Sequence, residues 1–407
     1  MAKPKVVAWP RDEAREAEFF EDPTPDRRTT YAAFLAEHGV TFPRELASSA
    51  EPWLLAYEHR DALFGPLAKY VAPNRDEMCP VQAEWSEGFA VELSLKAHPK
   101  AGHGSAYDSP PYSAGTKKAA TLVKALPKVP VARFVRHLRL GTPEGSNDVV
   151  TDYEEAVRAL VDVRESLPAL RELSLVQSRT DSLRLSSLAP WWSAQDTPLE
   201  PLAQTLEVLR FTARSFALPV LTWARLRELV VRTKAHLHDD WLASLLESRW
   251  PALESLSLDA LGDPYSTAPS SQRSAGVSTG PSEPLQQLLA GETSVRALRH
   301  LGLRNATFGN EALDRLVQGP LFTTLRSLDL SGGHVTIERL RTHADALRGL
   351  DSLDLTECLL DEAGLVEART LLPNATLSKS GQAPDRHHEA RYTYATHAMV
   401  FDARRPS

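Results

Sequence analysis

The chain has 407 residues, a length that predicts two or three domains, or one repeat array with a cap. Hydrophobic residues make up 42% of it and charged residues 24%, a composition typical of a soluble globular protein. Its net charge of −7 argues against a general nucleic-acid binder, since phosphate contacts need a surplus of lysine and arginine.

The first residues predict no export or membrane segment. They contain only a short apolar run, VVAW, whereas a secretory signal needs about 7–15 apolar residues. No uncharged run approaches the roughly 18 residues of a membrane span. The two cysteines, Cys79 and Cys358, are too few for a disulfide framework or a zinc ligand set. We therefore expect a reduced, cytoplasmic protein.

Residues 1–88 predict a small, mainly helical N-terminal domain. Helices are expected at residues 13–20, 28–38 and 52–70, and the sequence DPTPD at residues 22–26 marks a break between the first two. Residues 91–95 then alternate apolar and polar side chains, as in a strand. We expect that strand to be the first rung of the repeats that follow.

Three segments of this region resemble the bacterial repeat-companion domain. Residues 22–39, DPTPDRRTTYAAFLAEHG, are similar to the core of that family, in which Asp-Pro and a few acidic residues precede Tyr-Ala-Asp-Trp-Leu-Glu-Glu-x-Gly. Residues 63–67 and 85–89 resemble its later landmarks. Ala33 and Phe34 depart from the pattern, because the family usually has Asp and Trp there. The resemblance covers about the first 95 residues and implies a domain that precedes leucine-rich repeats, without an activity.

Eight later segments share the pattern apolar-x-x-apolar-x-apolar. The last one continues to Cys358 and Leu360 and completes the leucine-rich-repeat signature, with Cys where Asn is common. The last two apolar positions alternate with polar ones, so they should be buried on one face of a short strand. One unit cannot bury its own apolar edge, and the units therefore stack into a parallel sheet. The segments are 135–140, 170–175, 206–211, 226–231, 253–258, 298–303, 325–330 and 350–355.

These segments predict an α/β leucine-rich-repeat solenoid over residues 89–377, with a parallel concave sheet and convex helices. Helices are expected between strands, for example at residues 239–246 and 310–317, where Asp239 and Asn310 are good N-cap residues. Spacings of 25–27 residues between some successive segments resemble the ribonuclease-inhibitor type. One spacing of 20 residues predicts a short unit without a full helix.

Several stretches interrupt or follow the repeats. Ser/Gly/Pro-rich sequences near residues 99–115 and 262–283 predict disordered insertions, and residues 378–407 predict a polar C-terminal tail. The pattern leaves open a degenerate unit around residues 183–185 and an edge strand at residues 392–400.

No set of residues in the sequence assembles an active site or a metal centre. The most metal-like cluster is His236, His238, Asp239 and Asp240, but it fits a turn into a helix capped by Asp239 better, since further ligands are not identifiable. Cys79 has no identifiable base to activate it as a nucleophile. We expect a protein without enzyme activity, metal or cofactor.

We expect a partner to bind on the concave face, where polar residues beside the inward leucines must point away from the core. Cations should dominate the first half of this face and carboxylates the second, with Arg210 and Arg232 contributing most to binding. The predicted function is a non-catalytic, monomeric scaffold that binds an unidentified protein rather than nucleic acid or membrane. A regulator of an enzyme, such as a GTPase-activating leucine-rich-repeat protein, and a purely structural spacer are the alternatives. The predicted binding residues are Lys96, Arg139, Arg210, Arg232, Asp259, Arg304, Asp329 and Asp354.

Overall fold

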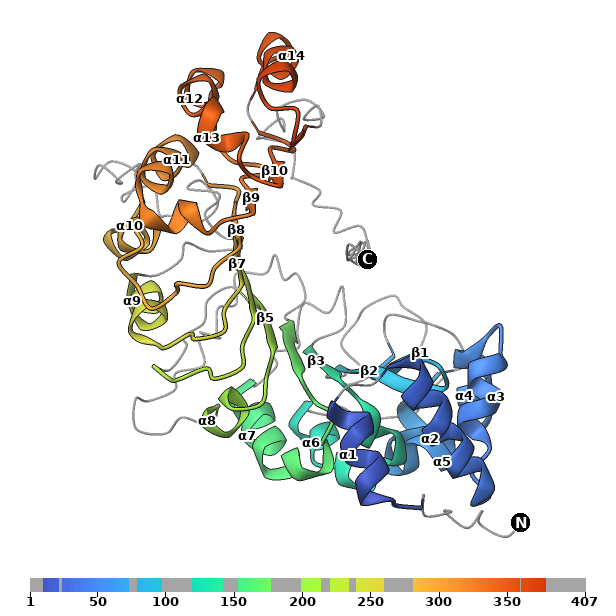
Figure 1. Cartoon of the computed structure of the whole chain (residues 1–407). Helices are drawn as coiled ribbons and strands as arrows, with labels where there is room; N and C mark the ends of the chain where they lie inside the picture. Colours follow the sequence, from blue (N-terminus) through green and yellow to red (C-terminus); the bar gives the residue numbers. More distant parts are fainter. Residues whose placement is uncertain are drawn as a thin grey trace, which may run out of the picture.

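One open sheet of eleven strands organises the chain in the computed structural model (Figure 1). The order of the strands in the sheet is their order in the sequence, so each strand pairs only with its neighbours along the chain. This is the order predicted for stacked repeats. The structure describes residues 10–21, 24–72, 79–96, 119–141, 153–176, 199–213, 220–233, 239–259, 281–306, 308–358 and 360–377.

The sheet is parallel except at its first pair. Strand β1 pairs antiparallel with β2, and every later pair from β2 to β11 is parallel. The nine strands predicted from the repeats and their first rung are all present, as β2 to β10. The strands are β1 Val81–Ser86, β2 Phe89–Lys96, β3 His137–Gly141, β4 Glu172–Val176, β5 Val208–Ala213, β6 Glu228–Thr233, β7 Ser255–Asp259, β8 His300–Arg304, β9 Ser327–Asp329, β10 Ser352–Asp354 and β11 Ala375–Thr376.

The register of the sheet aligns one leucine from each repeat in a continuous buried column. These leucines are at most 2% exposed, which confirms the predicted core. Successive side chains of a strand point to opposite faces, so the residues between the leucines lie on the other face of the sheet. The column consists of Leu93, Leu138, Leu173, Leu209, Leu229, Leu256, Leu301, Leu328 and Leu353.

Helices cover the outer, convex side of the curved sheet, and the strands line its inner, concave side (Figure 1). The helices predicted at residues 239–246 and 310–317 are confirmed as α9 and α11. The convex helices are α6 Ala119–Val123, α7 Tyr153–Val163, α8 Glu200–Ala203, α9 Asp239–Glu247, α10 Glu283–Leu289, α11 Gly309–Gln318, α12 Ile337–Thr342, α13 Ala344–Leu347 and α14 Glu362–Leu371, and the short 3₁₀ turns are η2 Leu126–Lys128, η3 Pro130–Phe134, η4 Arg164–Ser166 and η5 Pro320–Thr323.

The predicted capping role of Asn310 is wrong. Phe308 occupies the N-cap position of α11, and Asn310 lies inside the helix. Its Oδ1 accepts a hydrogen bond of 3.0 Å from the backbone N–H of Thr336 in the next unit. Asn310 therefore joins two successive units and does not cap the N-terminus of its own helix.

The connection between β5 and β6 differs from those between the other parallel strands. Its described residues, 220–227, contain no helix, in agreement with the short spacing there. Thr222 instead forms a parallel bridge with Arg249 of the following unit. The buried indole rings of Trp223 and Trp250 stack beside it, with ring centroids 5.7 Å apart. These two rings supply buried apolar surface of the kind that a helix supplies elsewhere.

Among the described residues of the N-terminal region, the last helical segment ends at Tyr70. Helices α1 Glu13–Glu21 and α2 Pro25–Glu37 match the first two predictions, but α3 Phe42–Ser48 was not predicted. The single helical stretch expected at residues 52–70 is three short segments, α4 Pro52–Glu58, α5 Arg60–Phe64 and η1 Gly65–Tyr70. Strand β1 also lies within the region expected to be helical, so part of that region belongs to the sheet.

A tight turn joins β1 to β2. Glu87 and Gly88 have φ angles of 48° and 81°, the positive values that a two-residue hairpin turn requires. A Cβ atom at Gly88 would lie 1.7 Å from the carbonyl oxygen of Pro43. Only glycine can therefore occupy this position while α3 packs against the turn.

The N-terminal helices pack directly on the first rungs of the sheet. Phe19 of α1 and Tyr31 of α2 join Phe89 and Phe134 in one buried aromatic cluster. Glu16, only 3% exposed, forms an ion pair with Arg133 of η3 and accepts a hydrogen bond of 3.0 Å from the Tyr31 hydroxyl. Burial and the negative charge of Glu16 raise the pKa of Tyr31. A buried charge pair thus joins α1 to η3, the turn that leads into β3.

Several predictions fall outside the described residues. These are the insertion near residues 99–115, most of the insertion at 262–283, the possible unit at 183–185 and the tail at 378–407. The last residues of the second insertion are ordered, because Ser282 is the N-cap of α10. Within the described part of the chain, no helix is both long and apolar enough to cross a membrane.

Candidate binding surface

The concave face carries three columns of side chains, set by the register of β2 to β10. The predicted binding residues came from the second and third columns; the first column follows from the same alternation of side chains but was not predicted. All eight predicted binding residues lie in the second and third columns. The first column is Glu92, His137, Glu172, Val208, Glu228, Ser255, His300, Ser327 and Ser352; the second is Ser94, Arg139, Ser174, Arg210, Val230, Ser257, Gly302, Asp329 and Asp354; the third is Lys96, Gly141, Val176, Thr212, Arg232, Asp259 and Arg304.

The first cluster on this face centres on His137. Its Nδ1 donates to Oε2 of Glu92 over 2.9 Å, and its Nε2 is hydrogen-bonded to Oγ of Ser174 over 2.7 Å. Burial alone would raise the pKa of Glu92, but the hydrogen bond and charge of His137, with the charges of Arg139 and Arg210, bring its pKa below the ordinary value. Both ring nitrogens of His137 therefore form hydrogen bonds within the protein.

Arg210 lies between two glutamates of the first column. Its Nη1 donates to Glu172 over 3.0 Å, and its Nε donates to Glu228 over 3.1 Å. Glu172 is also 3.6 Å from Nε of Arg136, and Arg136 Nη2 donates to Glu207 over 2.9 Å. This cross-strand network fixes the orientation of the guanidinium of Arg210.

The charges further along the sheet, from β6 onward, are paired in the same way. Nε of Arg232 lies 3.8 Å from Asp259, which accepts a hydrogen bond of 2.6 Å from Nδ2 of Asn305. Nε of Arg304 lies 3.5 Å from Asp329. Asp329 and Asp354 also accept backbone hydrogen bonds from the residues two positions on, over 2.9 and 2.8 Å. These two carboxylates stabilise the turns that follow their strands.

The first half of the concave face is not purely cationic, as the second and third columns alone would indicate, whereas carboxylates still outnumber arginines in the second half. The glutamates of the first column place three negative charges among the cations of the first half, at Glu92, Glu172 and Glu228. Lys96 and Arg139 lie half-buried in the same half. Charges of both signs therefore line the first half of the concave face, so a complementary partner needs both signs of charge there.

The pH dependence of stability should reveal the Glu92 cluster. Since its folded pKa lies below the ordinary value of 4.5, ionised Glu92 stabilises the fold above that pH, and the contribution is lost as pH falls through the folded pKa. The difference in free energy of unfolding between wild type and Glu92→Gln, from urea titrations, should shrink between about pH 5 and pH 3. The exposed Glu58→Gln control should show little difference at any pH. A difference for Glu92→Gln that grows on acidification would contradict the assignment.

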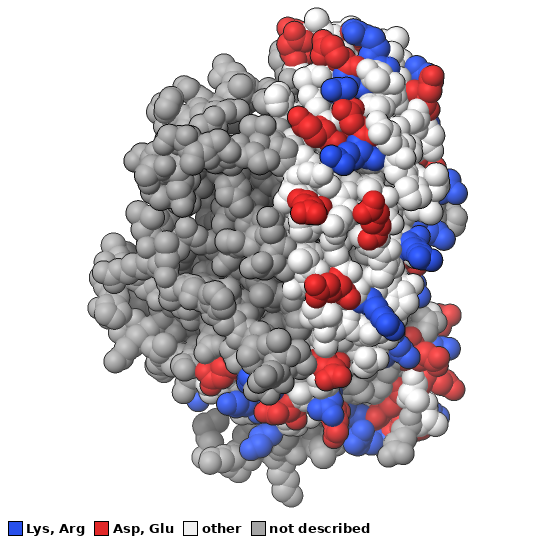
Figure 2. Space-filling model, turned by 90° about the vertical axis from the view of Figure 1, so that its left-hand side faces the viewer, with Lys and Arg blue, Asp and Glu red and all other residues white. Residues whose placement is uncertain are grey.

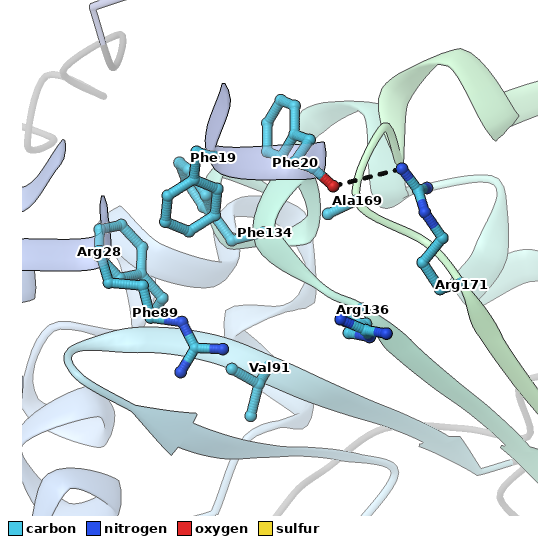
Figure 3. Close-up of a pocket in the computed structure, with 9 residues that line it drawn as sticks. All are labelled: Phe19, Phe20, Arg28, Phe89, Val91, Phe134, Arg136, Ala169 and Arg171. Atoms are coloured by element: carbon cyan, nitrogen blue, oxygen red, sulfur yellow. Dashed lines mark hydrogen bonds between the residues drawn. The ribbon is translucent and has the colours of Figure 1, made fainter. Parts of the chain in front are cut away.

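A small cavity lies where the strands begin, next to the N-terminal helices (Figure 3). Its free volume is about 10 Å³, close to the space that one water molecule occupies. The cavity was not predicted from the sequence, because its residues come from separate elements. It is lined by Phe19, Phe20, Arg28, Phe89, Val91, Phe134, Arg136, Ala169 and Arg171.

Neither cysteine is placed for nucleophilic chemistry. The Cys358 thiol donates to the carbonyl oxygen of Leu330 over 3.2 Å, and burial raises its pKa to about 12. It thus bridges two successive turns, a role consistent with the Asn-like position in the repeat. Cys79 is 1% exposed and donates to the carbonyl oxygen of Tyr70 over 3.0 Å. Among the described residues, no three His, Cys, Asp or Glu side chains are grouped as metal ligands.

The surface drawn in Figure 2 is on the side of the convex helices. Lysine and arginine are interspersed there with aspartate and glutamate, and uncharged residues fill the areas between them (Figure 2). A mixed surface of this kind is typical of a solvated helical face.

No known protein family and no curated protein matches this sequence. Similar solved structures include a protein from Bacteroides fragilis, 16% identical, with a TM-score of 0.47 over 63% of this chain and 69% of that chain. An internalin from Listeria monocytogenes is 14% identical, with a TM-score of 0.29 over 63% of this chain and 70% of its own. With TM-scores below 0.5, these similarities do not define the fold, which rests on the strand order and register described above.

Proposed function

We propose that this protein is a leucine-rich-repeat scaffold that binds a protein partner on its concave face and catalyses no reaction. Its N-terminal region would be the repeat-companion domain that the sequence resembles, and its repeats would be of the ribonuclease-inhibitor type. The protein would act as a monomer in the cytoplasm.

One observation carries the proposal: the outward columns form a continuous surface, the first two across β2 to β10 and the third across β2 to β8. Adjacent strands lie about 4.8 Å apart, so successive side chains of a column form a line of functional groups. A surface of this extent suits a broad macromolecular partner better than a small substrate.

The charge pattern of the surface supports a protein over a nucleic acid. The arginines at 210, 232 and 304 each lie within 4 Å of a carboxylate. A polyphosphate backbone would meet these carboxylates as repulsive neighbours, whereas a protein with both signs of charge could match them. Arginines held in place by ion pairs also lose little side-chain entropy when they bind.

The test is affinity capture from a lysate of the native host cells with three matched proteins. The wild type is compared with a concave variant, Arg210→Ala/Arg232→Ala, and a convex control, Arg315→Ala/Arg341→Ala. Arg315 and Arg341 are exposed on α11 and α12. All three should melt within a few degrees of each other, and a protein captured by the wild type and the control should be lost from the concave variant.

Equal capture by the concave variant and the wild type would show that the partner binds elsewhere. Failure of the wild type to capture any protein would favour a structural spacer. Turnover of a nucleotide by the captured partner, accelerated on adding the scaffold, would favour a regulator of an enzyme.

A further inference from the structure

The cavity at the start of the strands gathers three guanidinium groups beside aromatic rings (Figure 3). Arg28 comes from α2, Arg136 immediately precedes β3, and Arg171 immediately precedes β4. Phe20, which is only partly buried, and the buried Phe89 supply part of its apolar wall. Positive charge and apolar surface thus meet in one small space.

Arg28 has too few partners for a partly buried charge. Its Nη1 donates to Oγ of Ser86 over 2.5 Å, while its buried Nε makes no hydrogen bond. Within the described part of the chain, no ion pair to a carboxylate is formed by Arg28. Burial lowers the pKa of Arg28, Glu87 partly opposes this, and the like charge of Arg136 adds to the lowering. An unsatisfied buried donor on a cation is costly unless an anion completes it.

The other two arginines are held in place by the protein. Arg171 Nη2 donates to the carbonyl oxygen of Phe20 over 3.3 Å, as Figure 3 shows, and its Nη1 donates to backbone carbonyl groups. Arg136 donates to Glu207 and lies near Glu172. These contacts fix two cations in position at the wall of the cavity.

The cavity lies beside the first column of the concave surface, because Arg136 lines the cavity and pairs with Glu172 of that column. Glu172, which pairs with Arg136, is also the partner of Arg210 in the second column. A chain lying on the concave face could therefore reach the cavity with one side chain. The free volume of about 10 Å³ admits a single oxygen atom with little rearrangement. A carboxylate needs to insert only one edge, whereas a tetrahedral phosphate group is bulkier.

We propose that this cavity binds the carboxylate of an acidic segment of the partner protein, with one oxygen accepting hydrogen bonds from Arg28 Nε and Arg136. An apolar residue next to the acidic one packs on Phe20. Charge-assisted hydrogen bonds of this kind are about twice as strong as neutral ones. The assignment rests on the proposed function, because its ligand belongs to a protein partner.

The experiment uses purified full-length protein and a fluorescein-labelled hexaglutamate peptide, with labelled hexaglutamine as the neutral probe. Fluorescence anisotropy at low ionic strength should show that wild type prefers hexaglutamate. Arg28→Gln should weaken that binding about tenfold or more, since a charge-assisted contact is lost. The matched control is Arg27→Gln on the same helix, whose guanidinium donates to the carbonyl oxygen of Glu18 outside the cavity. Its affinity should stay within about twofold of wild type.

Two further variants distinguish binding of the peptide in the cavity from non-specific electrostatic attraction to the protein surface. Arg28→Lys keeps the charge but removes Nε, and should bind as weakly as Arg28→Gln. Wild-type affinity for Arg28→Lys, or equal losses for Arg27→Gln and Arg28→Gln, would overturn the proposal. The concave variant Arg210→Ala/Arg232→Ala should keep hexaglutamate binding, so failure of the cavity and failure of the concave face are distinguishable.

Thermal unfolding gives an independent readout. Without peptide, Arg28→Gln should melt at or above the temperature of wild type, because a partly buried charge with an unsatisfied Nε has been removed. Hexaglutamate should raise the melting temperature of wild type and leave that of Arg28→Gln unchanged. A melting temperature of Arg28→Gln well below wild type would show that Arg28 is a structural residue, and no response of wild type to the peptide would leave the cavity as a water site.

Discussion

Replacing Leu328 with alanine should lower the free energy of unfolding by about 2–5 kcal/mol. Leu328 is fully buried in the leucine column, where it pairs in register with Leu301 on one side and Leu353 on the other. Truncation removes apolar contacts with both neighbouring units and leaves a cavity that a rigid sheet cannot collapse to fill. Urea denaturation followed by circular dichroism measures the loss.

The matched control for this change is Val366→Ala on α14. Val366 is a large apolar residue that is 60% exposed, so its truncation should change stability by less than about 0.5 kcal/mol. If Leu328→Ala costs well under 1 kcal/mol, or no more than the control, position 328 does not belong to the core.

Glu16→Gln should destabilise the docked N-terminal helices by about 3–5 kcal/mol, because it breaks one member of a buried ion pair. The variant leaves Arg133, whose side chain is 18% exposed, without its carboxylate. It also removes the negative charge of the carboxylate that accepts a hydrogen bond from the buried Tyr31 hydroxyl. Intrinsic fluorescence and protease resistance of α1 and α2 report the loss during urea titration.

A neighbouring glutamate provides the control. Glu18 lies on the same helix but is exposed, so Glu18→Gln should behave like wild type. The double change Glu16→Leu/Arg133→Met replaces the ion pair with apolar groups and should recover most of the stability, as buried pairs often do. A Glu16→Gln protein as stable as Glu18→Gln would mean that the ion pair does not hold α1 on the sheet.

The repeat pattern predicted the sheet well because its signal is local and recurs. Each strand is specified by leucines two positions apart, and the same spacing returns in every unit. Strand order and register then follow from stacking, since adjacent units must align their leucines to bury them. The predicted helix at residues 310–317 likewise carries its apolar face within one segment, as α11 confirms.

The N-terminal region was predicted less well for a physical reason. Helices α3, α4 and α5 have only five to seven residues each, too few for a periodic apolar face to be recognised. Strand β1 depends on the turn at Gly88, which in turn depends on the close approach of Pro43. Such contacts between distant residues leave little trace in the local sequence.

The candidate surface was predicted in part. Alternation along the strands placed Arg139 and Arg210 correctly on the concave face, but ion pairs between strands depend on register. Arg210 meets Glu172, 38 positions earlier in the chain. To predict the cavity, one would also need to know how the N-terminal helices pack, since it forms only when α1 and α2 pack over the beginnings of β3 and β4.

The pairing of every strand with its sequence neighbours alone has a consequence for how the chain can vary. The register of each strand depends on the two strands beside it and hardly on the length of the chain that connects them. Lengthening a connection adds a closure entropy that grows only with the logarithm of its length. Connections of very different length therefore coexist in one sheet, as those between β5 and β6 and between β7 and β8 do. Such an architecture is modular: new surface sequence can be acquired between rungs while the leucine core keeps its geometry.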